Sequence, residues 1–456
     1  MTIPLAELAD GPVFLRDLQH DPIVIDRAEG VHLYDEDGKA YLDAASGAAV
    51  TSIGHGRAEV AEVLAAQARR LAFAHPSKFL TRPALELAQK MVDRAPEGFS
   101  RVFFTSGGSE SVEAAIKLSR QVHLAHGRTA KVKTISRRTS YHGATLGALA
   151  VTGQGERTEP FAALLRVEPK IASCYPYRCA WCAEALSCTL ACADDLERVI
   201  EAEGPDQVAT FIAEPIVGSS APGADASPAY WRRIRDICDR HDVLFVADEV
   251  MSGNGRSGTW WAMQQAGVTP DLIATAKGIG AGYASLGALL VRDDAYDAFR
   301  ATRSNFRHGH TYSGNPLSAA VGSLVIDVIE RERLLENVRV MGASLRARLE
   351  TELGSHPHVG DVRGRGLLLG VEFVADRASR APFDPAWRVQ SRLSRACLER
   401  GLYVYQGGGS AGAIGGDHVL IAPPFIIAQE HVETIVGTLA EALDAVVREL
   451  PTVSPA

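Results

Sequence analysis

The stretch VLFVADEVMSGNGRSGTWWAMQQAGVTPDLIATAKGIGAGY, residues 243–283, decides the fold class. It contains two apolar runs of strand length, residues 243–248 and 272–276, separated by a segment that is compatible with a helical crossover. Strands joined in this way form a parallel pair. Asp248 ends the first run and Lys277 follows the second. The stretch therefore predicts a parallel α/β unit with ionisable side chains at the carboxyl edge of its sheet.

The same pattern extends over the middle of the chain. Further apolar runs of strand length lie at residues 101–104, 132–136, 210–214 and 286–291, most of them separated by helix-compatible segments. This alternation predicts a largely parallel sheet with helices on both faces.

The two ends of the chain have a different character. Runs at 365–374, 402–405 and 418–425 read as strands, and a helical apolar stripe follows them, formed by Val432, Ile435, Val436, Leu439, Leu443, Val446 and Val447. Near the N-terminus, residues 31–34 and 40–43 read as a hairpin around the turn DEDGK. We expect residues 1–55 and 326–456 to form one small discontinuous α+β domain, with residues 56–325 as the large domain.

Bulk composition narrows the class of protein. The chain has 456 residues, 46% hydrophobic and 22% charged, with a formal net charge of −8 and no basic run of the kind that binds nucleic acid. Its first twenty residues lack a basic stretch followed by an apolar core, and no run of about eighteen apolar residues occurs. We therefore expect a cytoplasmic globular protein with no nucleic-acid or membrane partner.

Five of the seven cysteines gather between residues 174 and 192. Cys179 and Cys182 have the C-x-x-C spacing of a zinc site, but the second pair, Cys188 and Cys192, has a different spacing and no histidine lies nearby. We expect reduced, partly buried thiols and no metal, with a structural zinc site as the alternative.

Chemistry-bearing residues follow successive predicted strands. After the apolar run at residues 101–104, Gly107, Gly108 and Ser109 open a predicted helix. The free N–H groups and the dipole of such a helix start suit a phosphate. Tyr141 and His142 follow the run at residues 132–136 and could stack on a flat ring. Glu214 ends the run at residues 210–214. Each signal alone is more often a turn, a cap or a core residue.

Asp248 and Lys277 complete this set. A carboxylate in an apolar segment needs a cationic partner, and a partly desolvated lysine is a nucleophile and a base. A phosphate site, a stacking ring, a carboxylate for a ring nitrogen and an imine-forming lysine together suit pyridoxal phosphate.

Nearly the whole chain resembles the class III aminotransferases of the fold-type I pyridoxal-phosphate enzymes. The motifs that carry the resemblance are LYDEDGKAYLDAASG, FFTSGGSESVEAAIKLSR, YHGATLGALAVTG, AEPIVG, ADEVMSGNGRSG, ATAKGIGAG and HGHTYSGNPLSAA. The resemblance implies a mostly parallel sheet of the seven-stranded type, flanked by helices, and a smaller α+β domain.

The resemblance also implies roles for single residues. Lys277 would form the internal aldimine and move the substrate proton, and Asp248 would pair with the pyridine nitrogen. Tyr141 would stack on one face of the ring and Val250 would pack on the other. The phosphate would be held by Gly107, Gly108 and Ser109.

Three further roles follow from the same resemblance. Glu214 would lie near O3′ of the cofactor, and His142 would support Tyr141. Thr311 would reach the phosphate bound by a neighbouring subunit, which implies a homodimer or a tetramer.

Two positions depart from the family pattern, and the substrate signal is weak. Gly107 stands where a serine is more frequent, and Asn254 where an aromatic residue is usual. Residues 404–425 contain no arginine, where some amine-using relatives carry a mobile one. Ala48 and Phe79 are our candidates for the substrate pocket, and Arg365 is a weaker candidate for a carboxylate.

The resulting prediction is an aminotransferase. It would act by a ping-pong mechanism, with an amine or ω-amino acid as donor and pyruvate or 2-oxoglutarate as acceptor. An aminomutase, racemase or decarboxylase would use the same cofactor residues and is the alternative. A binding protein on a decayed scaffold would be expected to lack Lys277 or Asp248, and both are present.

Overall fold

The computed structural model describes residues 11–18, 21–179, 181–182, 188–409 and 415–451. The strands are β1 (Ile25–Glu29), β2 (His32–Asp35), β3 (Ala40–Asp43), β4 (Phe99–Thr105), β5 (Lys133–Arg137), β6 (Lys170–Ile171), β7 (Val208–Ala213), β8 (Leu244–Asp248), β9 (Leu272–Thr275), β10 (Gly287–Arg292), β11 (Val359–Arg365), β12 (Leu368–Phe373), β13 (Leu402–Tyr403), β14 (Tyr405–Gly408) and β15 (Asp417–Ile421).

The α-helices are α2 (Ser46–Ala49), α3 (Ala58–Arg70), α4 (Arg82–Val92), α5 (Gly108–Ala125), α6 (Leu146–Ala150), α7 (Gly155–Thr158), α8 (Ala191–Glu203), α9 (Pro228–His241), α10 (Met263–Ala266), α11 (Asp293–Thr302), α12 (Pro316–Arg331), α13 (Leu334–Leu353), α14 (Val389–Glu399) and α15 (Gln429–Arg448). The 3-10 helices are η1 (Glu159–Leu164), η2 (Pro176–Arg178), η3 (Pro205–Gln207), η4 (Lys277–Ile279) and η5 (Pro385–Trp387).

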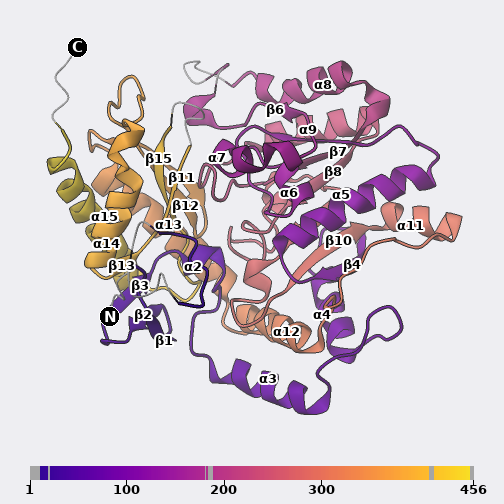
Figure 1. Ribbon diagram of the computed structural model, residues 1–456, viewed down its shortest axis with the longest axis horizontal. Helices are drawn as coiled ribbons and strands as arrows, with labels where there is room; N and C mark the ends of the chain where they lie inside the picture. Colours follow the sequence, from indigo (N-terminus) through magenta and orange to yellow (C-terminus); the bar gives the residue numbers. More distant parts are fainter. Residues whose placement is uncertain (1–10, 19–20, 180, 183–187, 410–414, 452–456) are drawn as a thin grey trace.

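The predicted large sheet is confirmed. It has seven strands in the order β4-β10-β9-β8-β7-β5-β6, and each of the predicted apolar runs of the middle region forms one of them (Figure 1). All are parallel except β10, which is antiparallel to both β4 and β9. The added strand β6 is only two residues long, too short to give a pattern in the sequence.

Alternation along the central strands explains the layers on either face of this sheet. Phe211 and Phe245 point to the side covered by α8 and α9, whereas Ile212 and Val246 point to the side covered by α5. All four side chains are fully buried, which stabilises the fold by about 1.5–3 kcal/mol for each large apolar side chain. Helices therefore cover both faces, as the nearly continuous apolar runs predict.

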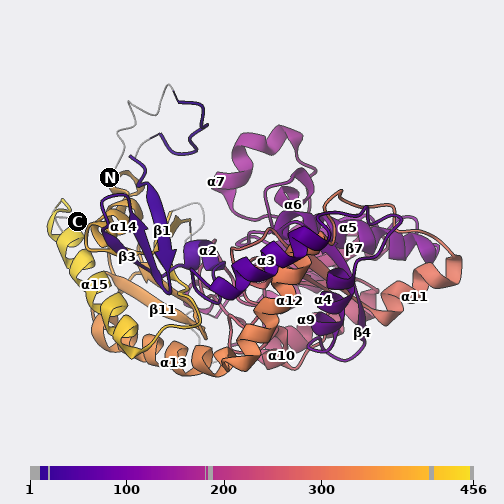
Figure 2. The ribbon, with the colours of Figure 1, turned by 90° about the horizontal axis from the view of Figure 1, so that it is seen from below.

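The two chain ends share a sheet. The predicted hairpin is confirmed as β2 and β3, and β13 from the C-terminal part pairs in parallel with β3, in the order β1-β2-β3-β13. A second small sheet has the order β11-β12-β15-β14. Figures 1 and 2 show these strands together, beside α13, α14 and α15. The domain boundaries at residues 55 and 325 stay a prediction.

The predicted stripe on the last helix is also confirmed. On α15 the residues Val432, Ile435, Val436, Leu439, Leu443 and Val446 are buried, and Val447 is partly buried against the same core. This core includes Leu402 of β13 and Ile421 of β15, so the stripe serves packing.

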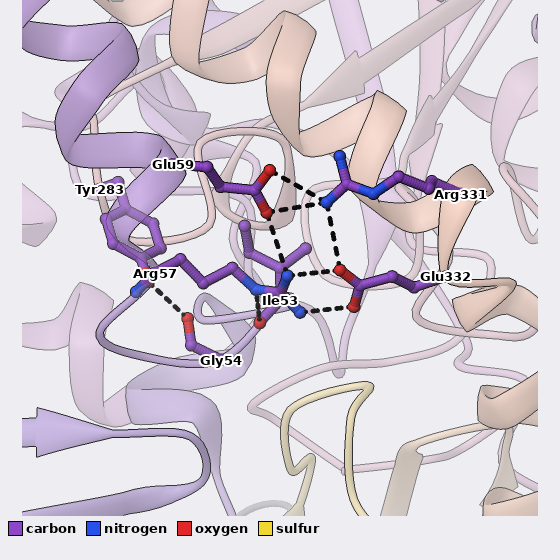
Figure 3. Close-up of polar contacts among 7 residues, drawn as sticks. All are labelled: Ile53, Gly54, Arg57, Glu59, Tyr283, Arg331 and Glu332. Atoms are coloured by element: carbon purple, nitrogen blue, oxygen red, sulfur yellow. Dashed lines mark hydrogen bonds and ion pairs between the residues drawn. The ribbon is translucent and has the colours of Figure 1, made fainter.

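An ion-pair network joins the N-terminal segment to the end of α12 (Figure 3). Arg57 donates to both carboxylate oxygens of Glu332, at 2.6 and 2.7 Å. Glu59 accepts from Arg57 and from Arg331. The backbone N–H of Arg57 donates to the hydroxyl of Tyr283, which in turn donates to the carbonyl of Gly54 at 2.9 Å. The segment that follows Lys277 is therefore fixed to the N-terminal part of the chain.

Within the described residues, no helix is long and apolar enough to cross a membrane.

Candidate functional site

A cavity of about 260 Å³ lies beyond the carboxyl ends of the central strands. Most of the predicted site residues line it, namely Ala48, Gly108, Ser109, Tyr141, His142, Glu214, Asp248, Val250 and Lys277. All except Ala48, which belongs to α2, end or follow different strands of the large sheet, whose carboxyl ends meet at one edge. The sequence order of these motifs therefore becomes one site in space.

The turn that carries Lys277 is held from both sides. Strand β9 ends at Thr275, and Lys277 has a left-handed backbone with φ of 50°. The side-chain amide of Asn254 donates to the carbonyl of Ala276 at 3.1 Å, and Ser52 Oγ donates to the carbonyl of Gly278 at 2.9 Å. These two bonds hold a conformation that non-glycine residues seldom adopt. Asn254, which departs from the family pattern, thus supports the lysine turn.

The amine of Lys277 is buried, and it donates to the carbonyl of Ala48 at 3.0 Å. Burial lowers the pKa of Lys277 to about 8, although the negative charges of Asp248 and Glu214 act in the opposite direction. At pH 7 about one tenth of this amine is therefore neutral and nucleophilic, a far larger fraction than for an ordinary lysine.

Asp248 ends β8 and is held by two donors. Nδ1 of His142 lies 2.7 Å from one carboxylate oxygen, and the backbone N–H of Val250 donates to the other at 3.1 Å. Both side chains are buried. The predicted role of His142 as a support for Tyr141 stays a prediction, and the bond observed here is to Asp248.

Glu214 follows β7 and links two loops of the site. Its carboxylate accepts from the backbone N–H groups of Tyr141, at 3.2 Å, and Gly218, at 2.9 Å. Burial raises the pKa of Glu214. The Tyr141 backbone is therefore fixed by Glu214, so that its ring lies in the cavity wall.

The N-terminus of α5 opens into the cavity. Gly107 is the N-cap residue and no side chain caps the helix there, so first-turn N–H groups are left for another acceptor. Gly108 and Ser109 line the cavity, and a Cβ at Gly108 would lie 2.9 Å from Val250. This end can bind an anion through backbone donors and the helix dipole.

Some predicted residues lie outside the cavity. Gly107 does not line it, and Thr311 and Phe79 are exposed, with 63% of Phe79 accessible. Arg365 donates hydrogen bonds to the carboxylate of Asp225 and to Gln265, so its guanidinium stabilises the fold outside the cavity. Residues 410–414 of the glycine-rich segment before PPF lie outside the described residues.

Sequence reasoning missed several residues of the cavity wall, which are Arg16, Gly143, Arg157, Ser219, Met251 and Tyr405. Gly143 and Met251 adjoin predicted motifs and could have been added by proximity. Arg16, Arg157 and Tyr405 lie in segments with no local signal, because only the tertiary fold brings them to the site.

The cysteines between 174 and 192 are free thiols. Sγ of Cys182 lies 3.2 Å from Sγ of Cys179 and 3.8 Å from that of Cys188, and these contacts raise the pKa of Cys182 to about 12. Among the described residues, no group of three or more His, Cys, Asp or Glu side chains is arranged to hold a metal ion. Residues 180 and 183–187 of this loop lie outside the described part, and the absence of a metal stays a prediction.

Comparison with known proteins identifies the family. The model of the family described as aminotransferase class III matches residues 15–443. The chain belongs to the class III aminotransferases. A probable aminotransferase of Mycobacterium tuberculosis is 40% identical to this aminotransferase over 430 residues, covering 93% of this chain and 90% of the relative.

Solved structures of transaminases share the fold. An (S)-enantioselective omega-transaminase from Thermomicrobium roseum has a TM-score of 0.90 and 36% identity to this aminotransferase, covering 97% of this chain and 98% of that one. The omega transaminase of Pseudomonas jessenii in complex with PMP has a TM-score of 0.90 and 31% identity, with 97% and 98% covered. The predicted enzyme class and fold class are thus confirmed.

Proposed function

We propose that this aminotransferase uses pyridoxal phosphate to move an amino group from an amine or ω-amino acid to a 2-oxo acid, in two half-reactions at one site. The observation that carries the proposal is the convergence of Lys277, Asp248 and the open N-terminus of α5 on one cavity. An amine, a carboxylate and an anion-binding helix end are the complements of an aldehyde, a protonated ring nitrogen and a phosphate.

The cavity fits this cofactor in its details. At the phosphate end, glycines leave space, and a Cβ at Gly143 would lie only 2.7 Å from Ser109 Oγ. At the ring, Tyr141 and Val250 line the wall and Asp248 lies buried with its two donors. His142 Nε2 is buried and has no hydrogen-bond partner among the described residues, consistent with an imidazole that donates through Nδ1 to Asp248.

The chain supplies positioning and proton transfer. When bound, pyridoxal phosphate would supply an electron sink for the negative charge that develops when the carbon bearing the donor's amino group loses its proton. Asp248 would hold the ring nitrogen protonated, and the donors from His142 and Val250 would keep this carboxylate in place. Lys277 would hold the cofactor covalently and, once free, would move the proton, for which a pKa of about 8 is well matched.

Features of the cavity support an amine donor. Ala48 is a small residue at the wall and offers its carbonyl to Lys277, and α2 is interrupted there by residues with non-helical backbone. A small side chain at this position leaves room for a bulky donor. The Thermomicrobium roseum relative is described as an omega-transaminase, an enzyme of the same reaction type.

The testing experiment follows the absorbance of the bound cofactor. The holoenzyme is mixed with a panel of amines and ω-amino acids, and the expected result is conversion of the aldehyde form to the amine form, reversed by pyruvate or 2-oxoglutarate. Borohydride reduction followed by peptide mass spectrometry is expected to place the cofactor on Lys277. A donor that is isomerised, racemised or decarboxylated without formation of the amine form would favour the alternative class.

We also propose that the enzyme is a cytoplasmic homodimer in which Thr311 serves the partner's phosphate site. The exposed position of Thr311, outside its own cavity, supports this assignment. Phe73 and Tyr312 are exposed, and their ring centres lie 6.0 Å apart beside Thr311, which also supports an interface. Phe79 would then line the substrate pocket of the partner.

A further inference from the structure

An arginine that no motif predicted lies in the wall of the cavity. Arg157 belongs to the short helix α7, and its Nε donates to the side-chain oxygen of Gln154 at 2.8 Å. Its guanidinium carbon lies 4.6 Å from the centre of the Tyr141 ring. These two contacts fix the guanidinium beside the ring that lines the site, in the same cavity as Lys277.

The two terminal nitrogens of Arg157 have no hydrogen bond or ion pair with any described residue. Two other arginines near the site are engaged, since Arg137 donates to the carbonyl of Glu214 and Arg256 to the carbonyl of Leu367. A guanidinium fork that faces a cavity with its paired donors free is matched in geometry to a carboxylate.

The cavity is polarised by these charges. Asp248 and Glu214 are buried at the strand ends, whereas Arg157 and the exposed Arg16 lie in the wall. The charge of Arg157 is felt at the lysine, whose pKa it helps to lower. An anionic group on a ligand that reacts at Lys277 would therefore be attracted to the side of the cavity formed by Arg157.

The proposed acceptors require such a cation. Every 2-oxo acid carries a carboxylate, whereas a simple amine donor carries none. Residues 404–425 contain no arginine, and Arg365 is held by Asp225. Helix α7 lies against this same arginine-free segment, because Glu156 Oε1 would be 3.8 Å from a Cβ at Gly408. Arg157 thus reaches the site from the element next to the segment that lacks an arginine.

We infer that Arg157 binds the carboxylate of the 2-oxo acid and so determines the class of acceptor. The inference rests on the proposed function, of which it specifies the second half-reaction. Arg157 acts as a specificity-determining residue, and it has no part in proton transfer.

The test separates the two half-reactions in the holoenzyme. Wild type, R157M, R157K and R16M are compared with the control R166M, an arginine that is 56% exposed and lies outside the cavity. Absorbance of the cofactor follows the reaction of the aldehyde form with an amine that lacks a carboxylate, and of the amine form with pyruvate or 2-oxoglutarate.

In R157M the 2-oxo acid concentration for half-maximal rate is expected to rise roughly 10- to 100-fold, because a charge-assisted pair of hydrogen bonds is lost. The corresponding concentration of the carboxylate-free amine is expected to change by less than about threefold, because that donor has no group for Arg157. R157K should lie between wild type and R157M, since lysine keeps the charge and loses the fork. R166M should match wild type in the half-maximal concentrations of both the 2-oxo acid and the amine.

A binding measurement complements the kinetics. Propionate, a carboxylate without an oxo group, is titrated into the aldehyde form and detected by the change in cofactor absorbance. Weaker propionate binding in R157M than in wild type supports the inference.

Three results would overturn the inference. The first is that the 2-oxo acid concentration for half-maximal rate does not change in R157M. The second is that the rates of both half-reactions fall equally in R157M, which would mean that Arg157 only supports Tyr141. The third is that the 2-oxo acid dependence changes in R16M and not in R157M. If wild type performs neither half-reaction, the proposed function fails, and the propionate titration still decides whether Arg157 binds a carboxylate.

Discussion

Lys277 owes its chemistry to the residues around it. A lysine at the end of a strand is by itself usually a surface group, and the sequence made it a candidate only together with Asp248 and the glycine turn of α5. The structure adds two causes that no motif encodes. Its amine is buried, which lowers its pKa to about 8, and Asn254 and Ser52 hold its left-handed backbone.

The lowered pKa of Lys277 predicts a pH profile for its reactivity. In cofactor-free protein, labelling of Lys277 by an amine-selective reagent should rise about tenfold for each pH unit and level off near pH 8, because only the neutral amine reacts and its fraction saturates above the pKa. An ordinary exposed lysine, with a pKa of about 10.4, should still be rising at pH 9. Peptide mass spectrometry over a pH series measures both.

Asp248 provides the control for the sign of this effect. Its negative charge raises the pKa of Lys277, so D248N should move the midpoint of labelling below pH 8. A midpoint that moves upward in D248N, or a wild-type midpoint near pH 10, would contradict the electrostatic account.

At the scale of elements, α5 connects a local sequence signal to a site. Glycines before a helix pattern predict an open helix start, and the structure places that start in the cavity wall. Gly107 has an extended backbone, and a Cβ there would meet nothing within 4 Å. A side chain at position 107 is thus tolerated, whereas one at position 108 would press on Val250.

These two glycines predict opposite responses to the same substitution. G107S should tighten cofactor binding by about 3- to 10-fold, because the serine hydroxyl adds one donor to an anion at the helix start. G108S should weaken binding and shift Val250. Equilibrium titration of pyridoxal phosphate into both cofactor-free variants measures the difference, and equal affinities for the two would contradict the assignment of the phosphate end.

The sequence predicted those elements that a local pattern of apolar residues marks, and it missed those that depend on tertiary packing. The strands β8 and β9 and the stripe of α15 were predicted because a period of apolar residues marks them. The site residues at strand ends followed from the same periodicity. Arg157 and Tyr405 could not be predicted, because they reach the cavity from α7 and β14 through tertiary packing. The two-residue strand β6 was missed for want of any pattern.

At the scale of the whole molecule, the joint in Figure 3 ties the N-terminal segment to α12. Arg57 is largely buried there and forms a two-bond pair with Glu332, whereas Arg331 is 54% exposed. We expect R57M to lower the free energy of unfolding by about 1–3 kcal/mol, because it removes both charge-assisted hydrogen bonds to the partly buried Glu332 carboxylate. R331M, the matched control, should cost less than about 1 kcal/mol. Denaturant unfolding measures both, and equal losses would contradict a special role for Arg57.

Assembly of two chains is the largest scale at which the site can be tested. If Thr311 completes the partner's phosphate site, then the K277A and T311E lesions fall in the same site of a mixed dimer and leave its other site intact. T311E places a negative charge near the phosphate, so its homodimer should bind the cofactor at least about tenfold more weakly. K277A should be inactive, because it lacks the amine that holds the cofactor.

Mixed dimers of these two variants contain one site that has neither lesion, formed by Lys277 of the T311E chain and Thr311 of the K277A chain. Unfolding and refolding an equal mixture should therefore restore about one quarter of the wild-type activity per chain, because half of the dimers are mixed and each has one intact site of two. Amino transfer from the best donor of the amine panel measures the recovery, and sedimentation confirms that dimers form. If mixed dimers form and their activity equals only the sum of the separate variants, Thr311 does not act across an interface, and each chain must build its phosphate site from α5 and its own loops.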